Sequence, residues 1–321
     1  MRAIQVPEFG GPEVLVVADV PDPPIGAGQA LVRVDASGVN FIDTYYRTGA
    51  YKRDVPFVAG EEGTGVVEAV GDDVSDIAVG DRVAWASAPG SYAELVAVDA
   101  GGAVPVPDGV DAPQAASALL QGMTAHYLLN SVYKPESGET ILVHAGAGGV
   151  GSVLTQLAAA RGVRVITTVS TDEKEQLSRE AGAAEVLRYG DDLPEQVRSL
   201  TGGEGVAAVY DGVGASTFDA SLASLRVRGT LALFGAASGK VDPVDPQRLN
   251  AAGSVILTRP KLADFTRTRE ELLWRANDVF GAIADGTLKI RVGATYPLAE
   301  AAQAHKDLEG RKTTGSIVLL P

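Results

Sequence analysis

The chain has 321 residues, of which 45% are hydrophobic and 21% are charged, a balance typical of a globular protein with a sizeable core. Its formal net charge of −14 disfavours binding to nucleic acid or to anionic lipid, because such a surface repels phosphates. The absence of cysteine excludes disulfides, thiolate nucleophiles and Cys-ligated metal sites, and fits a reducing compartment such as the cytoplasm. We expect neither a signal peptide nor a membrane span, because no apolar run is long enough.

Residues 1–122 are predicted to form a β-rich, barrel-like first part, because short apolar runs recur between Gly and Pro residues. The expected strands include four runs: Leu31–Val34, Gly65–Val70, Arg82–Trp85 and Glu94–Val98.

Residues 123–262 change to an alternation of β-branched runs and helical stretches, which predicts a doubly wound parallel sheet. The expected strands are Thr140–His144, Val163–Val169, Glu185–Arg188, Val206–Tyr210, Thr230–Phe234 and Ser254–Thr258. The expected helices include Gly149–Ala160, Asp172–Ala181 and Pro194–Leu200.

Residues 263–321 form the third part of the chain. One amphipathic helix is expected near Arg269–Asp285, and a second is expected to open at Tyr296–Leu298. The run Gly315–Leu320 is predicted to be a closing strand that returns to the first part.

The segment after the first strand of the alternating region contains the spacing G-x-G-x-x-G. Its glycines are Gly146, Gly148 and Gly151, with Gly149 and Val150 between the last two. A strand precedes the segment and a helix follows it, which is the setting of a dinucleotide-binding loop rather than of a simple tight turn. The sequence therefore predicts a bound dinucleotide.

The end of the second strand decides between NAD and NADP. An NAD site places a carboxylate there to hold the ribose 2′-hydroxyl, whereas this strand is followed by Ser170 and Thr171. Lys174 lies within a turn and can pair with a 2′-phosphate, which favours NADPH. Two alternatives remain open: Asp172 can bind the ribose, and Ser170 with Glu173 can form a capping box.

Taken together, several motifs resemble those of the zinc-independent quinone oxidoreductases, a group that includes ζ-crystallin, in the medium-chain dehydrogenase/reductase superfamily. The matching segments are Gly38–Tyr45, Gly49–Tyr51, Gly60–Gly65, Gly80–Val83, His144–Gly151, Asp211–Gly214, Phe234–Gly235, Thr258–Pro260 and Gly310–Gly315. The resemblance implies a Rossmann domain inserted in a β-rich, GroES-like catalytic domain, and a homodimer.

By position, the resemblance also implies two sets of site residues. Asn40, Tyr45 and Tyr51 correspond to substrate-side residues. The expected cofactor contacts are Gln121, Lys174, Tyr189, Phe234, Ser238 and Arg311. For Tyr189, a half-buried aromatic at a strand end is the alternative, and for Arg311 it is an ordinary surface charge.

A metal site is not expected. The three histidines, His126, His144 and His305, show no local pairing, and His144 is expected to pack beside the glycine loop.

These features predict an NADPH-dependent quinone reductase with a small-molecule substrate. Without a metal, the conjugation of a quinone stabilises the arriving charge, and Tyr45 or Tyr51 can donate a hydrogen bond to the forming oxyanion while Asn40 orients the carbonyl or the nicotinamide. Hydride and one-electron transfer both remain open. The alternatives are an NADPH-dependent reductase of α,β-unsaturated carbonyls and a non-catalytic nucleotide- or RNA-binding protein.

Overall fold

The computed structural model describes residues 1–321, which divide into two compact units. Unit 1 comprises residues 1–121 and 267–321, and unit 2 comprises residues 122–266. Unit 1 is therefore built from both ends of the chain, and unit 2 is built from the segment between them.

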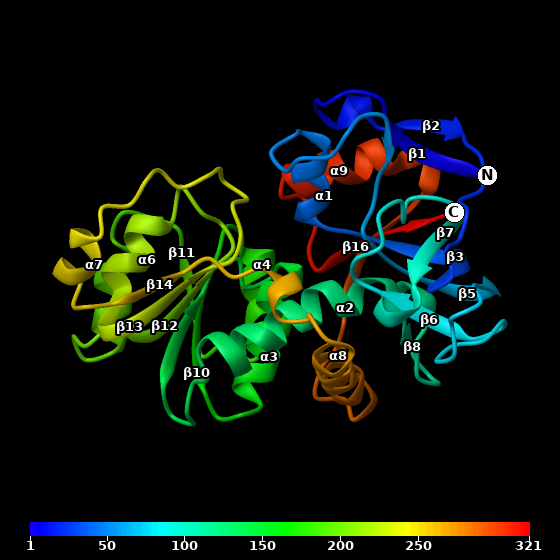
Figure 1. Ribbon diagram of the computed structural model, residues 1–321. Coiled ribbons are helices and arrows are strands. Elements are labelled where there is room, and N and C mark those ends of the chain that lie inside the picture. Colours follow the sequence, from blue (N-terminus) through cyan, green and yellow to red (C-terminus); the bar gives the residue numbers. More distant parts are fainter. The chain divides into compact units, whose positions relative to one another are not determined.

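Unit 1 contains two sheets, one of three strands in the order β2-β1-β4 and one of seven strands in the order β15-β16-β3-β5-β6-β8, with β7 also paired to β3. The strands are β1 (Arg2–Val6), β2 (Val16–Asp19), β3 (Gln29–Val39), β4 (Phe57–Val58), β5 (Glu62–Val70), β6 (Arg82–Trp85), β7 (Leu95–Asp99), β8 (Val104–Pro105), β15 (Val292–Pro297) and β16 (Ser316–Leu320). Strand β16 pairs antiparallel with β3 (Figure 1), which confirms that the closing strand returns to the first part of the chain.

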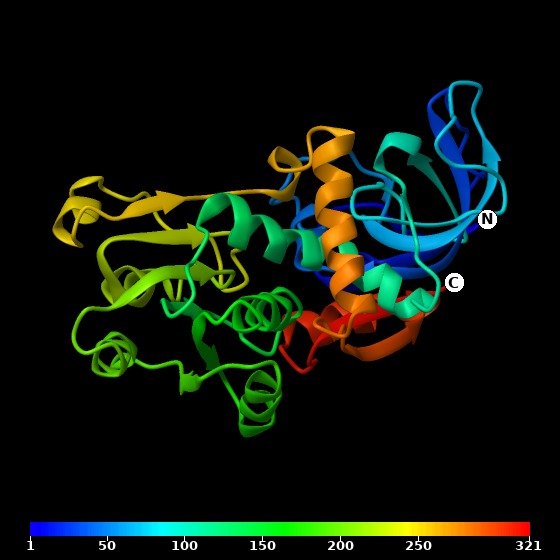
Figure 2. The same cartoon turned by 90° about the horizontal axis from the view of Figure 1, so that it is seen from below.

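The helices of unit 1 differ from the predicted ones in two respects. They are α1 (Phe41–Arg47), the first part of α2 (Ala112–Tyr127), α8 (Arg269–Ala284) and α9 (Ala301–Glu309). Helices α1 and α2 lie in or begin in a region that was expected only to be β-rich; in α2 the many alanines favour helix. The helix expected to open at Tyr296–Leu298 begins at Leu298, as a 3-10 turn over Leu298–Glu300 that leads into α9, whereas Tyr296 and Pro297 end β15. Helix α8 is the long orange helix in Figure 2.

Unit 2 is a six-stranded parallel sheet in the order β11-β10-β9-β12-β13-β14, which is the strand order of a Rossmann fold. The strands are β9 (Thr140–Val143), β10 (Arg164–Val169), β11 (Glu185–Arg188), β12 (Val206–Asp211), β13 (Leu225–Leu233) and β14 (Ile256–Thr258). The helices are α3 (Gly149–Ala159), α4 (Asp172–Glu180), α5 (Leu193–Leu200), α6 (Phe218–Ser224) and α7 (Gln247–Ala251).

Helices cover both faces of this sheet. Ile166 of β10 packs in a core cluster with Val197 of α5 and Leu222 of α6. The next residue, Thr167, shares a hydrogen bond of 2.7 Å with Ser178 of α4. Because neighbouring strand residues point to opposite faces, α4 lies on the face opposite to α5 and α6, and the doubly wound prediction is confirmed.

Two strands in unit 2 begin two or more residues from the predicted position, whereas the other strand boundaries agree within one residue. Strand β13 begins at Leu225 rather than Thr230, and its pairing with β12 shifts register near Arg228, whose φ is 60°. Strand β14 begins at Ile256 rather than Ser254, because Ser254 has a φ of 56°, a left-handed conformation that does not fit a strand.

No helix of the structure combines the length and the apolar character that crossing a membrane would require.

Candidate functional site: a glycine loop and a buried polar chain

The glycine loop joins the carboxyl end of β9 to the start of α3. Its backbone is tightly folded: Ala145 has a φ of 54°, and a Cβ atom on Gly146 would overlap with Thr167 and Ser178. A Cβ atom on Gly151 would overlap with the Ala145 carbonyl oxygen. Glycine is therefore required at both positions, as a close approach of loop, sheet and helix demands.

Helix α3 presents its first turn at the end of this loop. Gly148 is the N-cap, no side chain caps the helix, and Gly149 and Val150 form its first turn. Uncapped first-turn amides and the positive end of the helix dipole form a site suited to a phosphate. The loop and the start of α3 thus fit the pyrophosphate of a dinucleotide.

The end of β10 carries the residues that were expected to choose between the two cofactors. Thr171, not Ser170, is the N-cap of α4, and its side chain accepts from the Lys174 amide at 3.3 Å. The alternative of a capping box formed by Ser170 and Glu173 was therefore wrong. Asp172, the acid nearest the strand end, accepts a hydrogen bond of 2.6 Å from Arg188 of β11.

Tyr189 lies against the glycine loop. Its hydroxyl accepts a hydrogen bond of 3.0 Å from the Ala145 amide. Its ring stacks on His144 with centroids 6.0 Å apart. Because the hydroxyl is bonded to the Ala145 amide, Tyr189 supports the backbone of the loop. The expectation that this hydroxyl joins Lys174 at a 2′-phosphate remains a prediction.

His144 packs beside the loop, as expected. Its Nδ1 lies 2.8 Å from Thr168 Oγ1 and its Nε2 lies 2.9 Å from Ser221 Oγ. Burial lowers the pKa of His144 below its usual value. The imidazole is therefore held neutral between two hydroxyl groups.

Asp211, at the end of β12, organises the next loop. Its carboxylate accepts hydrogen bonds from the amides of Val213 and Gly214 at 2.8 and 3.0 Å, and also from the hydroxyls of Thr217 and Ser221. The loop that follows β12 is thereby fixed by one buried acid.

Phe234 and Ser238 lie on the loop that follows β13. The Phe234 ring packs so closely on Gly212 that a Cβ atom there would overlap with it. The Ser238 hydroxyl donates to the Val213 carbonyl at 2.8 Å and accepts from the Ser216 amide at 3.0 Å. Both predicted contact residues thus line the carboxyl edge of the sheet in unit 2.

A chain of buried polar side chains crosses unit 1. Asn40, the N-cap of α1, donates from Nδ2 to Glu62 Oε2 at 2.7 Å and accepts at Oδ1 from Gln121 Nε2 at 3.1 Å. Gln121 Oε1 in turn accepts from the Ser316 hydroxyl at 2.8 Å. The structure therefore joins Asn40 and Gln121, one from each predicted set, and orients both amides.

Glu62 is fully buried and has no cation partner among its hydrogen bonds. Its other oxygen, Oε1, accepts from the Leu120 amide at 2.8 Å. Burial, opposed by these hydrogen bonds, raises the pKa of Glu62 to about 8. The carboxyl group next to Asn40 therefore keeps its proton to a higher pH than an exposed carboxyl group does.

Three tyrosines and one arginine form a cluster at the end of α1: Tyr45 and Tyr46 belong to the helix, and Tyr51 and Arg53 lie in the segment after it. The rings of Tyr45 and Tyr51 are 5.1 Å apart, and Tyr46 meets Tyr51 edge-on at 5.8 Å. Arg53 lies 3.9 Å from the Tyr46 ring centroid and pairs with Glu61 at 2.6 Å. The two predicted substrate residues, Tyr45 and Tyr51, are therefore neighbours in one aromatic cluster.

Beneath α1 lies a second buried polar cluster. Tyr92 donates to Asp43 Oδ2 at 2.8 Å, and its oxygen lies 3.2 Å from His305 Nε2. Arg47 lies 3.0 Å from His305 Nδ1 and pairs with Glu309 at 2.7 Å. Burial raises the pKa of Asp43 to about 7 and lowers the pKa of His305 to about 3, so the imidazole is neutral.

Arg311 lies in unit 1, in an exposed turn after α9 with a φ of 54°. The predicted cofactor contacts therefore come from both units: Gln121 and Arg311 from unit 1, and the others from unit 2.

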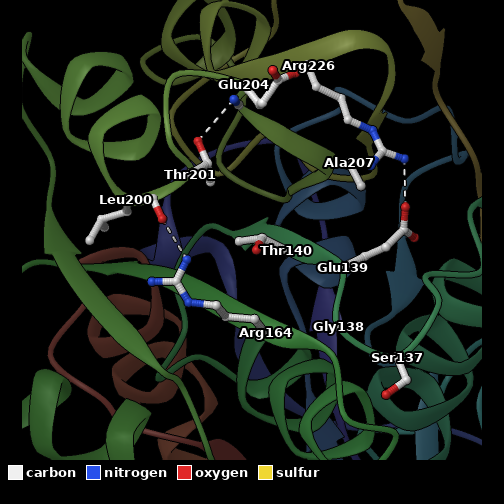
Figure 3. A pocket seen from close by; sticks show the side chains of 11 residues that line it. Ser137, Gly138, Glu139, Thr140, Arg164, Leu200, Thr201, Glu204, Ala207 and Arg226 are labelled. Atoms are coloured by element: carbon white, nitrogen blue, oxygen red, sulfur yellow. Dashed lines mark hydrogen bonds and ion pairs between the residues drawn. The ribbon is translucent and has the colours of Figure 1, made fainter.

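A hollow of about 540 Å³ lies at the opposite edge of the unit 2 sheet (Figure 3). It is lined by the starts of strands, including Thr140 of β9 and Arg164 of β10. Its two cations are engaged: Arg226 pairs with Glu139 at 2.6 Å, and Arg164 donates to the Leu200 carbonyl at 2.8 Å. In parallel sheets of this kind ligands bind at the carboxyl ends of the strands, so this hollow is not the dinucleotide site.

Sequence reasoning missed four residues of these networks. Glu62 and Asp211 were considered only as parts of matched motifs, although an acid directly beside a glycine in each motif is a signal that could have singled them out. Arg188 was read only as a strand residue, and Tyr92 carried no local signal because its partners are distant in sequence.

Comparison with known proteins agrees with this architecture. Residues 26–108 match the family described as "Alcohol dehydrogenase GroES-like domain", and residues 149–272 match "Zinc-binding dehydrogenase". A quinone oxidoreductase of Pseudomonas aeruginosa is 45% identical, with 100% of this chain and 99% of the relative covered. A 2-haloacrylate reductase of a Burkholderia species is 41% identical over 100% of this chain and 99% of the relative.

Solved structures show the same relationship. A mycobacterial protein complexed with NADPH is 62% identical, with a TM-score of 0.99 and 100% of both chains covered. The Escherichia coli quinone oxidoreductase complexed with NADPH is 40% identical, with a TM-score of 0.97 and 100% of both chains covered. The chain therefore belongs to the quinone oxidoreductase family of the medium-chain dehydrogenase/reductase superfamily.

Proposed function

We propose that this oxidoreductase transfers reducing equivalents from NADPH to quinones. The observation that carries the proposal is the glycine loop, which meets an uncapped helix at the carboxyl edge of a Rossmann sheet. Two relatives, the mycobacterial protein and the E. coli quinone oxidoreductase, were solved with NADPH. When bound, the reduced nicotinamide supplies the reducing equivalents.

The residues of the chain have separate roles in this proposal. Gly146, Gly148, Gly149, Val150 and Gly151 hold the pyrophosphate. Ser170, Lys174 and Tyr189 bind the adenosine half of the cofactor with its 2′-phosphate. The remaining cofactor contacts are made by Phe234, Ser238, Gln121 and Arg311.

The substrate side is the aromatic cluster of α1. Tyr45 and Tyr51 stack on or donate to the quinone, and Asn40 is held by Glu62 and Gln121 so that its amide keeps one orientation. Preorganised groups of this kind lower a barrier because they need not reorient during the reaction.

A second function is favoured by one relative. The 41% identical 2-haloacrylate reductase acts, by its name, on an activated double bond, so reduction of α,β-unsaturated carbonyls is the competing activity. Oxidation of NADPH, followed at 340 nm against panels of quinones, enals and saturated aldehydes, separates the two. Quinone turnover with no enal turnover supports the proposal, whereas the reverse pattern contradicts it.

We further propose that the reaction needs no zinc. The chain has no cysteine, and two of its histidines, His144 and His305, are engaged by hydroxyl groups and by Arg47. Activity after dialysis against EDTA is expected to equal that of the untreated protein. Stoichiometric zinc in elemental analysis, with inactivation by the chelator, contradicts this.

We also propose a cytoplasmic homodimer. The outer edge of β14 offers unpaired backbone groups, and Ile256 and Val227 nearby are 58% and 68% exposed; such an edge pairs readily with a second copy. Light scattering coupled to size exclusion tests the dimer, and a mass of one chain contradicts it. Cell fractionation tests the location.

A further inference from the structure

Arg188 spans the carboxyl ends of two neighbouring strands in unit 2. It ends β11 and lies beside Val169, the last residue of β10. Its Nη1 donates to the Thr171 carbonyl at 2.9 Å, and its Nη2 donates to Asp172 Oδ1 at 2.6 Å and to Glu175 Oε2 at 2.8 Å. One guanidinium thus holds the backbone and two carboxylates at the start of α4.

The end of β10 is the place where NAD and NADP sites differ, because in NAD sites a carboxylate at the end of the second strand binds the ribose 2′-hydroxyl. Asp172 is the acid nearest that end, and its side chain is otherwise fully exposed. The first turn of α4 holds three acids, Asp172, Glu173 and Glu175. Without a neighbouring cation these acids repel a 2′-phosphate and leave Asp172 available to a hydroxyl.

We propose that Arg188 determines cofactor specificity by holding Asp172 in an ion pair, so that a 2′-phosphate is accepted at the end of β10. This inference rests on the proposed NADPH-dependent function. Arg188 acts through Asp172, so it is a positioning residue rather than a group that chooses the cofactor by direct contact.

The test is a double-mutant cycle read by nucleotide binding. Dissociation constants of NADPH and NADH are measured by isothermal titration calorimetry for wild type, Arg188→Ala, Asp172→Ala and the double variant. Arg188→Ala is expected to weaken NADPH binding roughly tenfold, because the released Asp172 carboxylate then repels the 2′-phosphate, and to leave NADH binding equal or tighter. Asp172→Ala in the Arg188→Ala background is expected to restore NADPH binding to within about threefold of wild type.

Two further variants exclude a purely structural effect. Arg179→Ala removes a cation that pairs with Glu175 on the same helix at 2.9 Å but does not contact Asp172, and it is expected to bind both nucleotides as wild type does. Arg188→Lys keeps the charge and is expected to retain most of the preference for NADPH.

The outcomes that overturn the inference are distinct from those that overturn the proposed function. Unchanged NADPH binding in Arg188→Ala, or a double variant as weak as the single one, refutes the role of Arg188 while NADPH dependence stands. A wild-type protein that binds neither nucleotide, or that prefers NADH, refutes the proposed function and this inference with it.

Discussion

Gln121 Nε2 donates a hydrogen bond to Asn40 Oδ1 at 3.1 Å, across 81 residues of sequence. Because Gln121 also accepts from Ser316, the amide of Gln121 cannot flip without losing both bonds. The oxygen of Asn40 is fixed in turn, and its nitrogen faces Glu62. The orientation of the Asn40 amide is therefore set by residues of β5, α2 and β16, which are Glu62, Gln121 and Ser316.

Removing the Gln121 side chain breaks this arrangement. Gln121→Ala leaves Asn40 Oδ1 and the Ser316 hydroxyl buried without their partner, so the free energy of unfolding is expected to fall by about 1–3 kcal/mol. Urea unfolding followed by circular dichroism measures it. Gln176→Ala, which removes an exposed amide bonded only to Glu180, is the control and is expected to change stability by less than about 0.5 kcal/mol. Equal stability of Gln121→Ala and wild type would show that the buried chain contributes nothing.

The phenol groups of Tyr45 and Tyr51 are expected to act on the substrate. Tyr45→Phe and Tyr51→Phe should each lower kcat with quinones by about tenfold, less than the hundredfold or more of a dedicated oxyanion donor, while NADPH affinity stays unchanged. Steady-state kinetics and a binding titration measure the two effects. Tyr296→Phe, whose hydroxyl bonds Asp307 on the surface of the same unit, is the matched control. Wild-type rates in both variants, and in Asn40→Ala, would mean that these residues are structural.

Lys174 is expected to discriminate between the two cofactors. A 2′-phosphate at the start of α4 makes charge-assisted hydrogen bonds, and losing one donor costs about 1.5–3 kcal/mol. Lys174→Ala should therefore weaken NADPH binding by roughly ten- to a hundredfold and leave NADH nearly unchanged. Comparing kcat/KM for both cofactors in wild type, Lys174→Ala and Asp172→Ala decides the matter. If wild type prefers NADH and Asp172→Ala harms NADH most, Asp172 binds the ribose and NADPH is the wrong assignment.

Glu62 makes the stability of the protein depend on pH. Burial raises its pKa from 4.5 to about 8, so the folded chain holds a proton that the unfolded chain releases. The stabilisation is complete below about pH 4.5 and is lost as the pH rises to about 8. Asp43, with its pKa raised to about 7, contributes with the same sign.

The variant Glu62→Gln removes the ionisable group and keeps the side-chain shape. We expect its urea midpoint to fall less than that of wild type between about pH 5 and pH 8, because Asp43 and Glu61, whose pKa values burial also raises, are then the groups that still titrate in this way. We compare how the urea midpoint of each protein changes with pH, because any loss of stability caused by the substitution itself is the same at every pH and cancels. Parallel curves for the two proteins would show that Glu62 is already ionised in the folded state.

The sequence by itself determined the Rossmann unit. Alternating strands and helices predict a parallel sheet, because each element shows its own periodicity over neighbouring residues. The spacing of Gly146, Gly148 and Gly151 predicts a phosphate loop, because glycines allow the backbone to approach the phosphates closely. The apolar run after Gly315 predicted the last strand, and the family resemblance implied that both chain ends build one domain, as the pairing of β16 with β3 shows. Helices α1 and α2 were not predicted. Helix α1 has only seven residues and directly follows a strand, whereas the alanines of α2 carry a helical signal that the expectation of a β-rich first part left out.

Only the tertiary structure decided which side chains meet. Glu62, Asn40 and Gln121 lie far apart in sequence. The pairing of β3 with β5 brings Asn40 next to Glu62, and Leu120 and Gln121 of α2 hydrogen-bond to these two residues. The capping residue of α4 and the pairing of Arg188 with Asp172 likewise depend on the register of β10 and β11. A linear pattern records the type and spacing of residues, whereas burial, hydrogen-bond partners and shifted pKa values arise only once distant segments exclude water together.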